Sequence, residues 1–238
     1  MNRKCKILVS GFAPFGGESM NPSFEAAKKL PREMVVECHS ALRLDESMSG
    51  AGMDVAATSE SAKPDSLTAE LTVIEVPVVF EKGFEVLWSA VQEVKPDLVF
   101  AIGQAGGRDK LTPEMVAINW ADARIPDNDG NQPLEVPVIE GAPKAYFTRM
   151  PAKRMAAAAS EAGVPAAVSY SAGTYVCNDL FFRLLHEIDE GKAAFTPQTG
   201  IFIHVPFVKE QNREPSMELS GITRGLEIMI REAIRLSS

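Results

Sequence analysis

The chain has 238 residues, a formal net charge of -8 at pH 7 and a sequence pI near 5.1. With 45% hydrophobic and 24% charged residues, it has the composition of a globular protein whose length suits one α/β domain. The acidic balance argues against nucleic acid or an anionic membrane as partner, because both require a basic face. No apolar run approaches the roughly 20 residues of a membrane span, and the run at 7–9 is too short for a signal peptide.

Cysteine usage predicts a reducing compartment. The three cysteines, Cys5, Cys38 and Cys177, are odd in number, far apart and without a CxxC pair. That pattern fits neither a disulfide framework nor a zinc site, and it is typical of a cytoplasmic protein.

Short apolar runs alternate with amphipathic segments. In chain order, we predict a strand at 6–12, a helix at 21–30, strands at 34–42 and 71–79, a helix at 81–94, a strand at 97–105, an extended segment at 115–125, a helix at 153–163, a strand at 166–173, a helix at 177–188, a strand at 200–207 and a helix at 217–236. The alternation predicts a single α/β domain over 1–238, a three-layer α/β/α sandwich around a largely parallel, mixed and twisted sheet. Sites in such sheets lie at the carboxyl ends of strands. Residues 43–70, rich in Ser, Ala, Gly and Asp, are predicted to form a flexible surface insertion.

One cysteine stands where chemistry is expected. In "SAGTYVCNDLFFRLLHEI" (171–188), Cys177 lies between an apolar run and the first turn of an apolar-faced helix. The free N–H groups and the dipole of a helix start stabilise an anion, which predicts a lowered thiol pKa. Cys5 opens the first predicted strand and Cys38 lies within the second, and for both a small buried side chain is the favoured interpretation.

A reactive thiol needs a base, and spacing narrows the choice among three histidines. His186 lies nine residues beyond Cys177, roughly 13.5 Å along the helix axis, so it cannot reach the thiol. His39 borders the predicted insertion and is interpreted as a strand-end or surface residue. His204 interrupts the buried strand "GIFIHVPF" near its carboxyl end. Two hypotheses remain for His204, a satisfied core histidine and the partner of Cys177.

A third, acidic group would orient that histidine. Glu114, Asp122 and Asp127 all precede or follow turn-like sequence in the middle of the chain, and spacing does not choose among them.

Four long blocks in a fixed order resemble the type I pyroglutamyl peptidases, also called pyrrolidone-carboxylate peptidases. The blocks are "GFAPFGGESMNPSFEAAKKL" (11–30), "GQAGGRDKLTPEMVAINWADARIPDNDGNQP" (103–133), "PAAVSYSAGTYVCNDLFFRLLH" (165–186) and "GIFIHVPF" (200–207). The resemblance implies a cytosolic, cofactor-free and metal-free cysteine exopeptidase that removes an N-terminal pyroglutamyl residue from peptides and small amides. It also implies a homodimer or homotetramer.

Carried over by position, the resemblance assigns the catalytic roles to Glu114, Cys177 and His204. The oxyanion donors would be the backbone N–H of Cys177 and the side chain of Arg124. Substrate contacts are expected from two aromatic and two amide side chains: Phe12, Phe15, Asn21 and Gln104. Asn21 has a second interpretation, because Asn before Pro22 also suits a helix N-cap.

The sequence departs from the family pattern in three places. Ala13 replaces the usual aspartate of "GFDPFGG", Met115 replaces the usual arginine after the glutamate, and the 43–70 segment is longer than expected. Two alternatives therefore stay open: a related cysteine amidase with another lactam or small-amide substrate, and a non-catalytic small-molecule-binding protein. A papain-type endopeptidase is disfavoured, because the C-G-[SA]-C-[WY] signature is absent.

Overall fold

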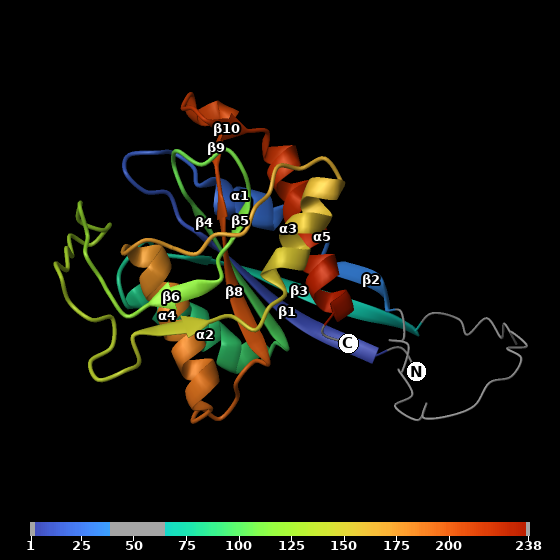
Figure 1. Cartoon of the computed structure of the whole chain (residues 1–238), viewed down its shortest axis with the longest axis horizontal. Coiled ribbons are helices and arrows are strands. Elements are labelled where there is room, and N and C mark those ends of the chain that lie inside the picture. Colours follow the sequence, from blue (N-terminus) through green and yellow to red (C-terminus); the bar gives the residue numbers. More distant parts are fainter. Residues whose placement is uncertain (1–2, 39–64, 237–238) are drawn as a thin grey trace, which may run out of the picture.

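The centre of the molecule is a six-stranded mixed sheet between two layers of helices (Figure 1). The computed structural model describes residues 3–38 and 65–236. In spatial order, the strands are β2 (Glu33–Cys38), β3 (Asp65–Val76), β1 (Arg3–Phe12), β4 (Leu98–Gln104), β8 (Thr199–Val205) and β5 (Thr112–Pro113). The four inner strands run parallel, and the edge strands β2 and β5 pair antiparallel to their neighbours. The predicted α/β/α sandwich with a largely parallel, mixed sheet is confirmed.

The helices divide between the two faces of the sheet. One face is covered by α1 (Pro22–Lys28), α3 (Ala152–Glu161) and α5 (Leu219–Leu236), and the other by α2 (Lys82–Val94) and α4 (Val176–Glu190) (Figure 1). Every residue of β8 is buried, as are the first six residues of β4, which explains why both strands read as continuous apolar runs. Residues of β8 alternate between the two cores: Ile201, Ile203 and Val205 face the α1/α3/α5 side, and Phe202 faces the α2/α4 side.

Two small strand pairs lie outside the main sheet. They are β6 (Val116–Ile118) with β7 (Ala145–Phe147), antiparallel, and β9 (Phe207–Val208) with β10 (Ser216–Met217), parallel. The sequence predicted the extended character of β6 but gave no signal for β7, β9 or β10, which are two or three residues long.

The structure corrects two predicted segments. Residues 166–173 form no strand; they make isolated bridges from Ala166 to Leu111 and from Ser169 to Glu114, because their two-residue neighbour β5 is too short to extend a ladder. Residues 65–70, predicted as part of a surface insertion, belong to β3 and pair with both β1 and β2. The rest of that predicted insertion, 43–64, lies outside the described residues.

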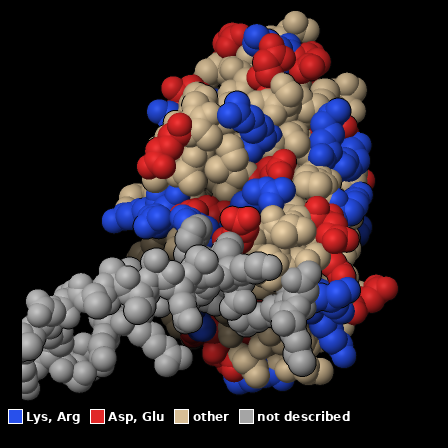
Figure 2. Space-filling model, turned by 90° about the vertical axis from the view of Figure 1, so that its right-hand side faces the viewer, with Lys and Arg blue, Asp and Glu red and all other residues tan. Residues whose placement is uncertain are grey.

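Charges of both signs are interspersed on the face of the molecule that Figure 2 shows. Acidic and basic side chains alternate there between patches of other residues, so this face carries no extended basic surface in its described part. Among the described helices, none is long and apolar enough to cross a membrane.

Candidate active site

The first turn of α4 holds Cys177 at the carboxyl edge of the sheet. Leu180, Phe181 and Leu184 are fully buried and fix the helix against the α2/α4 core. The side chain of Asn178 adds a polar anchor: it accepts a hydrogen bond from the backbone N–H of Ile118 (3.0 Å) and donates to the carbonyl of Trp120 (3.0 Å). The helix start is therefore held from both sides, and Cys177 has little freedom to move relative to the sheet.

Gly103, in β4, lies directly beneath the thiol. A Cβ atom at this position would be 3.1 Å from Cys177 Sγ and 2.6 Å from Phe202 Cζ. In the parallel register of β4 and β8, Gly103 pairs with His204. The absent side chain thus lets the sulfur approach the strand pair beside the histidine. Our sequence reasoning missed this role, although a glycine inside an otherwise apolar strand is its signal.

His204 and Glu114 form a buried pair. Nδ1 of His204 lies 2.7 Å from Oε1 of Glu114, and both side chains are almost completely inaccessible. Glu114 follows β5, and its backbone N–H donates to the carbonyl of Phe202 (2.8 Å), which fixes the carboxylate against β8. Because an ionised carboxylate can only accept, His204 carries its proton on Nδ1 and leaves Nε2 as a free base.

The other two candidate acids lie elsewhere. Asp122 is exposed, and its backbone rather than its side chain is bonded to Thr174. Asp127 is buried, but its carboxylate accepts from the backbone N–H of Phe80 and Asn131 and so holds the 127–131 turn. Among the described carboxylates, the contact with His204 belongs to Glu114.

Burial and mutual contact set the charge state of the Glu114–His204 pair. Burial raises the pKa of Glu114, but the hydrogen bond and charge of His204, with help from Ser169 and Arg108, outweigh it and leave that pKa below its usual value. Burial lowers the pKa of His204 more than Glu114 raises it. At rest the pair is therefore an ionised carboxylate and a neutral imidazole.

The prediction of a lowered thiol pKa at Cys177 is wrong for the resting site. Burial, followed by the negative charge of Glu114, raises the pKa of the thiol to about 12. Arg108 and the backbone N–H at the helix start act in the opposite direction but do not prevail. In the described part of the chain, no hydrogen bond joins Cys177 Sγ to His204; Gly103, which lies beneath the sulfur and pairs with His204, connects the two positions.

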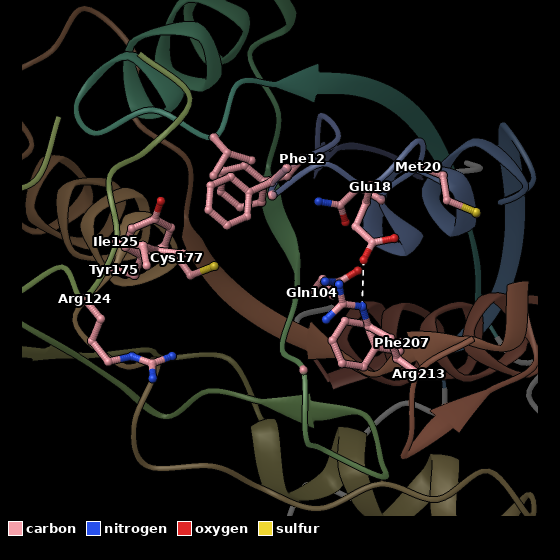
Figure 3. Close-up of a pocket in the computed structure, with 15 residues that line it drawn as sticks. Phe12, Glu18, Met20, Gln104, Arg124, Ile125, Tyr175, Cys177, Phe207 and Arg213 are labelled. Carbon is pink, nitrogen blue, oxygen red and sulfur yellow. Dashed lines mark ion pairs between the residues drawn. The ribbon is translucent and has the colours of Figure 1, made fainter. Parts of the chain in front are cut away.

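A cavity of about 420 Å³ opens over the thiol (Figure 3). Its wall contains the nucleophile candidate and all the predicted side chains for substrate and oxyanion: Phe12, Phe15, Asn21, Gln104, Arg124 and Cys177. Figure 3 shows Cys177 Sγ directed into the cavity from one side, with Phe12 above it and Gln104 across from it. The polypeptide segments that supply these residues are far apart in sequence and meet at the carboxyl ends of β1, β4 and β8.

The aromatic wall is built in two layers. Phe12 is buried and packs against Phe202, with ring centroids 6.3 Å apart. Phe15 is half-buried and contacts Tyr175, with ring centroids 5.6 Å apart. Tyr175 and Ile125 also line the cavity and were not predicted from sequence.

The two amides differ in how much hydrogen-bonding capacity they retain. Asn21 caps α1: its Oδ1 accepts from the N–H of Ser23 (3.1 Å), and its Nδ2 donates to the carbonyl of Ala13 (3.0 Å). Gln104 accepts from Gln211 Nε2 through its Oε1 (2.9 Å). Among the described residues, no bond occupies Gln104 Nε2, so this amide retains a donor directed at the cavity.

The cations of the cavity also differ. Arg124 is exposed, and in the described part of the chain its guanidinium has no ion pair. Arg213, across the cavity, is paired with Glu18 at 2.8 Å and lies over the ring of Phe207 (Figure 3). Glu18, Arg213 and Phe207 were not predicted from sequence: Glu18 and Arg213 lie in irregular segments without periodic pattern, and the apolar pattern at Phe207 indicated only a strand.

The second described histidine, His186, is not part of this site. His186 is half-buried further along α4, where its Nδ1 lies 2.8 Å from the Tyr146 hydroxyl. His39 lies outside the described residues. Across the described ranges, no group of three or more His, Cys, Asp or Glu side chains forms a potential metal site.

Fold and site together define a class: an α/β protein with an enzyme-type pocket in which a cysteine thiol lies beside a buried histidine–carboxylate pair. Residues 52–236 match the family model described as pyroglutamyl peptidase. A pyrrolidone-carboxylate peptidase from Enterococcus faecalis is 42% identical over 97% of this chain and 93% of its own length. One from Streptococcus pyogenes serotype M1 is 44% identical over 94% and 90%.

Solved structures agree with the sequence comparisons. The crystal structure of Bacillus amyloliquefaciens pyroglutamyl peptidase I is 40% identical and has a TM-score of 0.77, covering 96% of each chain. A mutant pyrrolidone carboxyl peptidase from Pyrococcus furiosus is 33% identical with a TM-score of 0.78, over 98% of this chain and all of the other. The chain belongs to the pyroglutamyl peptidase family, and with it to the peptidases.

The raised thiol pKa predicts an unusual alkylation profile. Iodoacetamide reacts with the thiolate, so the rate at Cys177 should still be rising above pH 9, measured by mass spectrometry against a Cys177→Ser background. A rate that is already maximal near pH 7 would show a resting thiolate–imidazolium pair and contradict the neutral site.

Proposed function

We propose that this protein is a cysteine exopeptidase that hydrolyses the amide bond after an N-terminal pyroglutamyl residue. The observation that carries the proposal is one cavity in which Cys177 Sγ faces an aromatic wall and lies beside the buried Glu114–His204 pair. The names of the related peptidases support the same substrate class.

Pyroglutamate has no free amino group, so its recognition requires a slot for a flat lactam ring rather than a carboxylate for an ammonium group. Phe12 and Phe15 offer such a slot near the thiol. The free Nε2 of Gln104 and the second Nδ2 hydrogen of Asn21 are donors suited to the lactam carbonyl. We assign both amides to substrate binding, with Asn21 also serving as the helix cap.

The first chemical step forms a thioester. His204 Nε2 takes the Cys177 proton as the sulfur attacks the carbonyl carbon that follows the lactam ring. The imidazolium that forms is stabilised by Glu114, which is ionised and already bonded to Nδ1. Because the Cys177 thiol and the His204 imidazole are both neutral at rest, the negative charge of the attacking group and the positive charge of the imidazolium form only during the attack.

The carbonyl oxygen of the substrate gains negative charge as the sulfur attacks, and this oxyanion needs hydrogen-bond donors. The backbone N–H of Cys177, at the start of α4, and the unpaired guanidinium of Arg124 are the candidates within the cavity wall. Collapse of the tetrahedral intermediate breaks the C–N bond, and His204 delivers its proton to the departing amine. The peptide leaves with a new free N-terminus.

A water molecule completes the cycle. His204, neutral again, removes a proton from water as the oxygen attacks the thioester carbonyl. The C–S bond breaks, the proton returns to the sulfur, and pyroglutamate is released. No redox step is involved, so the cycle requires neither an oxidant nor a cofactor.

The proposal extends to the surroundings of the protein. A cysteine nucleophile must stay reduced, which supports a cytoplasmic site of action. Exposed apolar side chains such as Trp120 and Leu134 support a homodimer or homotetramer.

Replacement of the nucleophile is the direct test of the function. Cys177→Ala should lower turnover of a pyroglutamyl-fluorophore amide by at least about a thousandfold, because Cys177 carries the only thiol among the described residues of the cavity wall. Cys5→Ala, in the core and away from the cavity, serves as the matched control. Near-normal turnover by Cys177→Ala would exclude the mechanism and leave a binding role.

The aromatic wall predicts a separable effect on specificity. Phe15→Ala should lower kcat/KM for a pyroglutamyl anilide roughly 10- to 100-fold with little change in the thermal midpoint, because the lost contact is with substrate. The control Phe147→Ala removes an exposed phenylalanine remote from the cavity. Prolyl and glutaminyl anilides, assayed in parallel, would reveal a related amidase if either is cleaved as fast as the pyroglutamyl compound.

A further inference from the structure

Arg108 contacts the carboxylate of Glu114 and has no role in the mechanism proposed above. Its Nη1 donates to Glu114 Oε1 at 2.6 Å and also to the hydroxyl of Thr112. Its Nη2 donates to the carbonyl of Ser171 at 3.0 Å. The Arg108 side chain is 27% exposed, whereas the Glu114 side chain is fully buried. The Arg108 guanidinium thus links three segments, which are the loop after β4, the segment around β5 and the segment that leads into α4.

Oxygen Oε1 of Glu114 is shared between two cationic or potentially cationic partners. His204 Nδ1 approaches it at 2.7 Å and Arg108 Nη1 at 2.6 Å. In this chain the residue after the glutamate is Met115, which packs beside the apolar core rather than on the carboxylate. The permanently charged cation in contact with the Glu114 carboxylate is therefore Arg108.

The net charge of the cluster formed by Arg108, Glu114 and His204 explains the effect of the Arg108–Glu114 contact. With Arg108 present, an ionised Glu114 is already neutralised, so a neutral His204 leaves the buried cluster without net charge. Without Arg108, the buried pair would carry a net negative charge that favours uptake of one proton from solvent, and His204 takes that proton wherever Glu114 stays ionised. A histidine protonated in that way cannot accept the proton of Cys177.

Few other described groups influence the protonation of His204 and Cys177. The charged and titratable side chains that influence His204 are Glu114, from the segment after β5, and Arg108, from the loop after β4. Cys177, from α4, is influenced by the same two. Ser169, opposite Glu114 in an isolated bridge, contributes a neutral hydroxyl.

We propose that Arg108 is a positioning residue that neutralises Glu114 and thereby keeps His204 unprotonated, so that the imidazole is available as the base at neutral pH. This rests on the proposed function for its kinetic readout, but its structural content concerns the protonation of His204 and can be measured without turnover.

The test separates charge from hydrogen bonding. Arg108→Gln keeps donors and removes the charge, Arg108→Lys keeps the charge and removes the fork, and Arg108→Met is a second neutral variant in case the glutamine variant does not fold. Arg224→Gln is the matched control, because Arg224 also donates to a loop carbonyl, that of Ala162, at 3.1 Å. Two quantities are measured: the pH dependence of kcat/KM with a pyroglutamyl anilide, and the NMR titration of the His204 ring, assigned with His39→Gln and His186→Gln.

We expect the neutral Arg108 variants to shift both the acid limb of kcat/KM and the His204 titration upward by ~1 pH unit. On the acid side of the limb, this is a roughly tenfold loss of kcat/KM. Arg108→Lys and Arg224→Gln should titrate like the wild type.

An unchanged His204 titration in a folded neutral variant would overturn the proposal, even if turnover fell equally at every pH, because Arg108 would then be only a structural tie between loops. If instead the titration shifts as expected while Cys177→Ala keeps its turnover, the role of Arg108 stands and the proposed function fails.

Discussion

The site depends on one buried contact, the 2.7 Å hydrogen bond between Glu114 and His204. Burying an ionised carboxylate is costly unless its charge is compensated and its oxygens are bonded. Compensation of the charge comes from separate segments, because His204 from β8 and Arg108 from the loop after β4 both contact Oε1, and the backbone of β8 holds Glu114 in place. Oε2 is buried without a hydrogen-bond partner among the described residues. The arrangement also fixes the imidazole tautomer, so the contact decides both where the ring lies and which nitrogen is free.

The rest of the fold brings a thiol to the same edge of the sheet, over the glycine that pairs with His204. Continuous burial of β4 and β8 holds Gly103 and His204 in register, and the apolar face of α4 holds its first turn over them. A glycine at 103 is required because any side chain there would occupy the position of the sulfur or of Phe202. The cavity is thus a consequence of three rigid elements meeting at one edge of the sheet, with the loop residues only completing its wall.

Much of this could be predicted from sequence, because long periodic or buried segments leave clear patterns. The elements of the sandwich, the cap at Asn21, the exclusion of His186 by helix length and the two-faced pattern around His204 all follow from local rules. The predictions that were wrong concern features that tertiary contacts determine. The period-2 apolar pattern of 65–70 was hidden in a polar composition, and the thiol pKa is set by burial and by Glu114, which outweigh the helix start. Local rules did not choose Glu114 among three acids, and only the family resemblance assigned it before the structure; the contact of Arg108 required the fold itself.

The central claim is that Cys177 carries the pyroglutamyl group during the reaction. The direct measurement is rapid acid quenching during turnover of a pyroglutamyl ester or amide, followed by intact-protein and peptide mass spectrometry. The account predicts a mass increase of one pyroglutamyl acyl group, confined to the peptide that contains Cys177 and sensitive to hydroxylamine, as a thioester is. An acyl group on another residue, or full turnover with an ester that never acylates the protein, would contradict it.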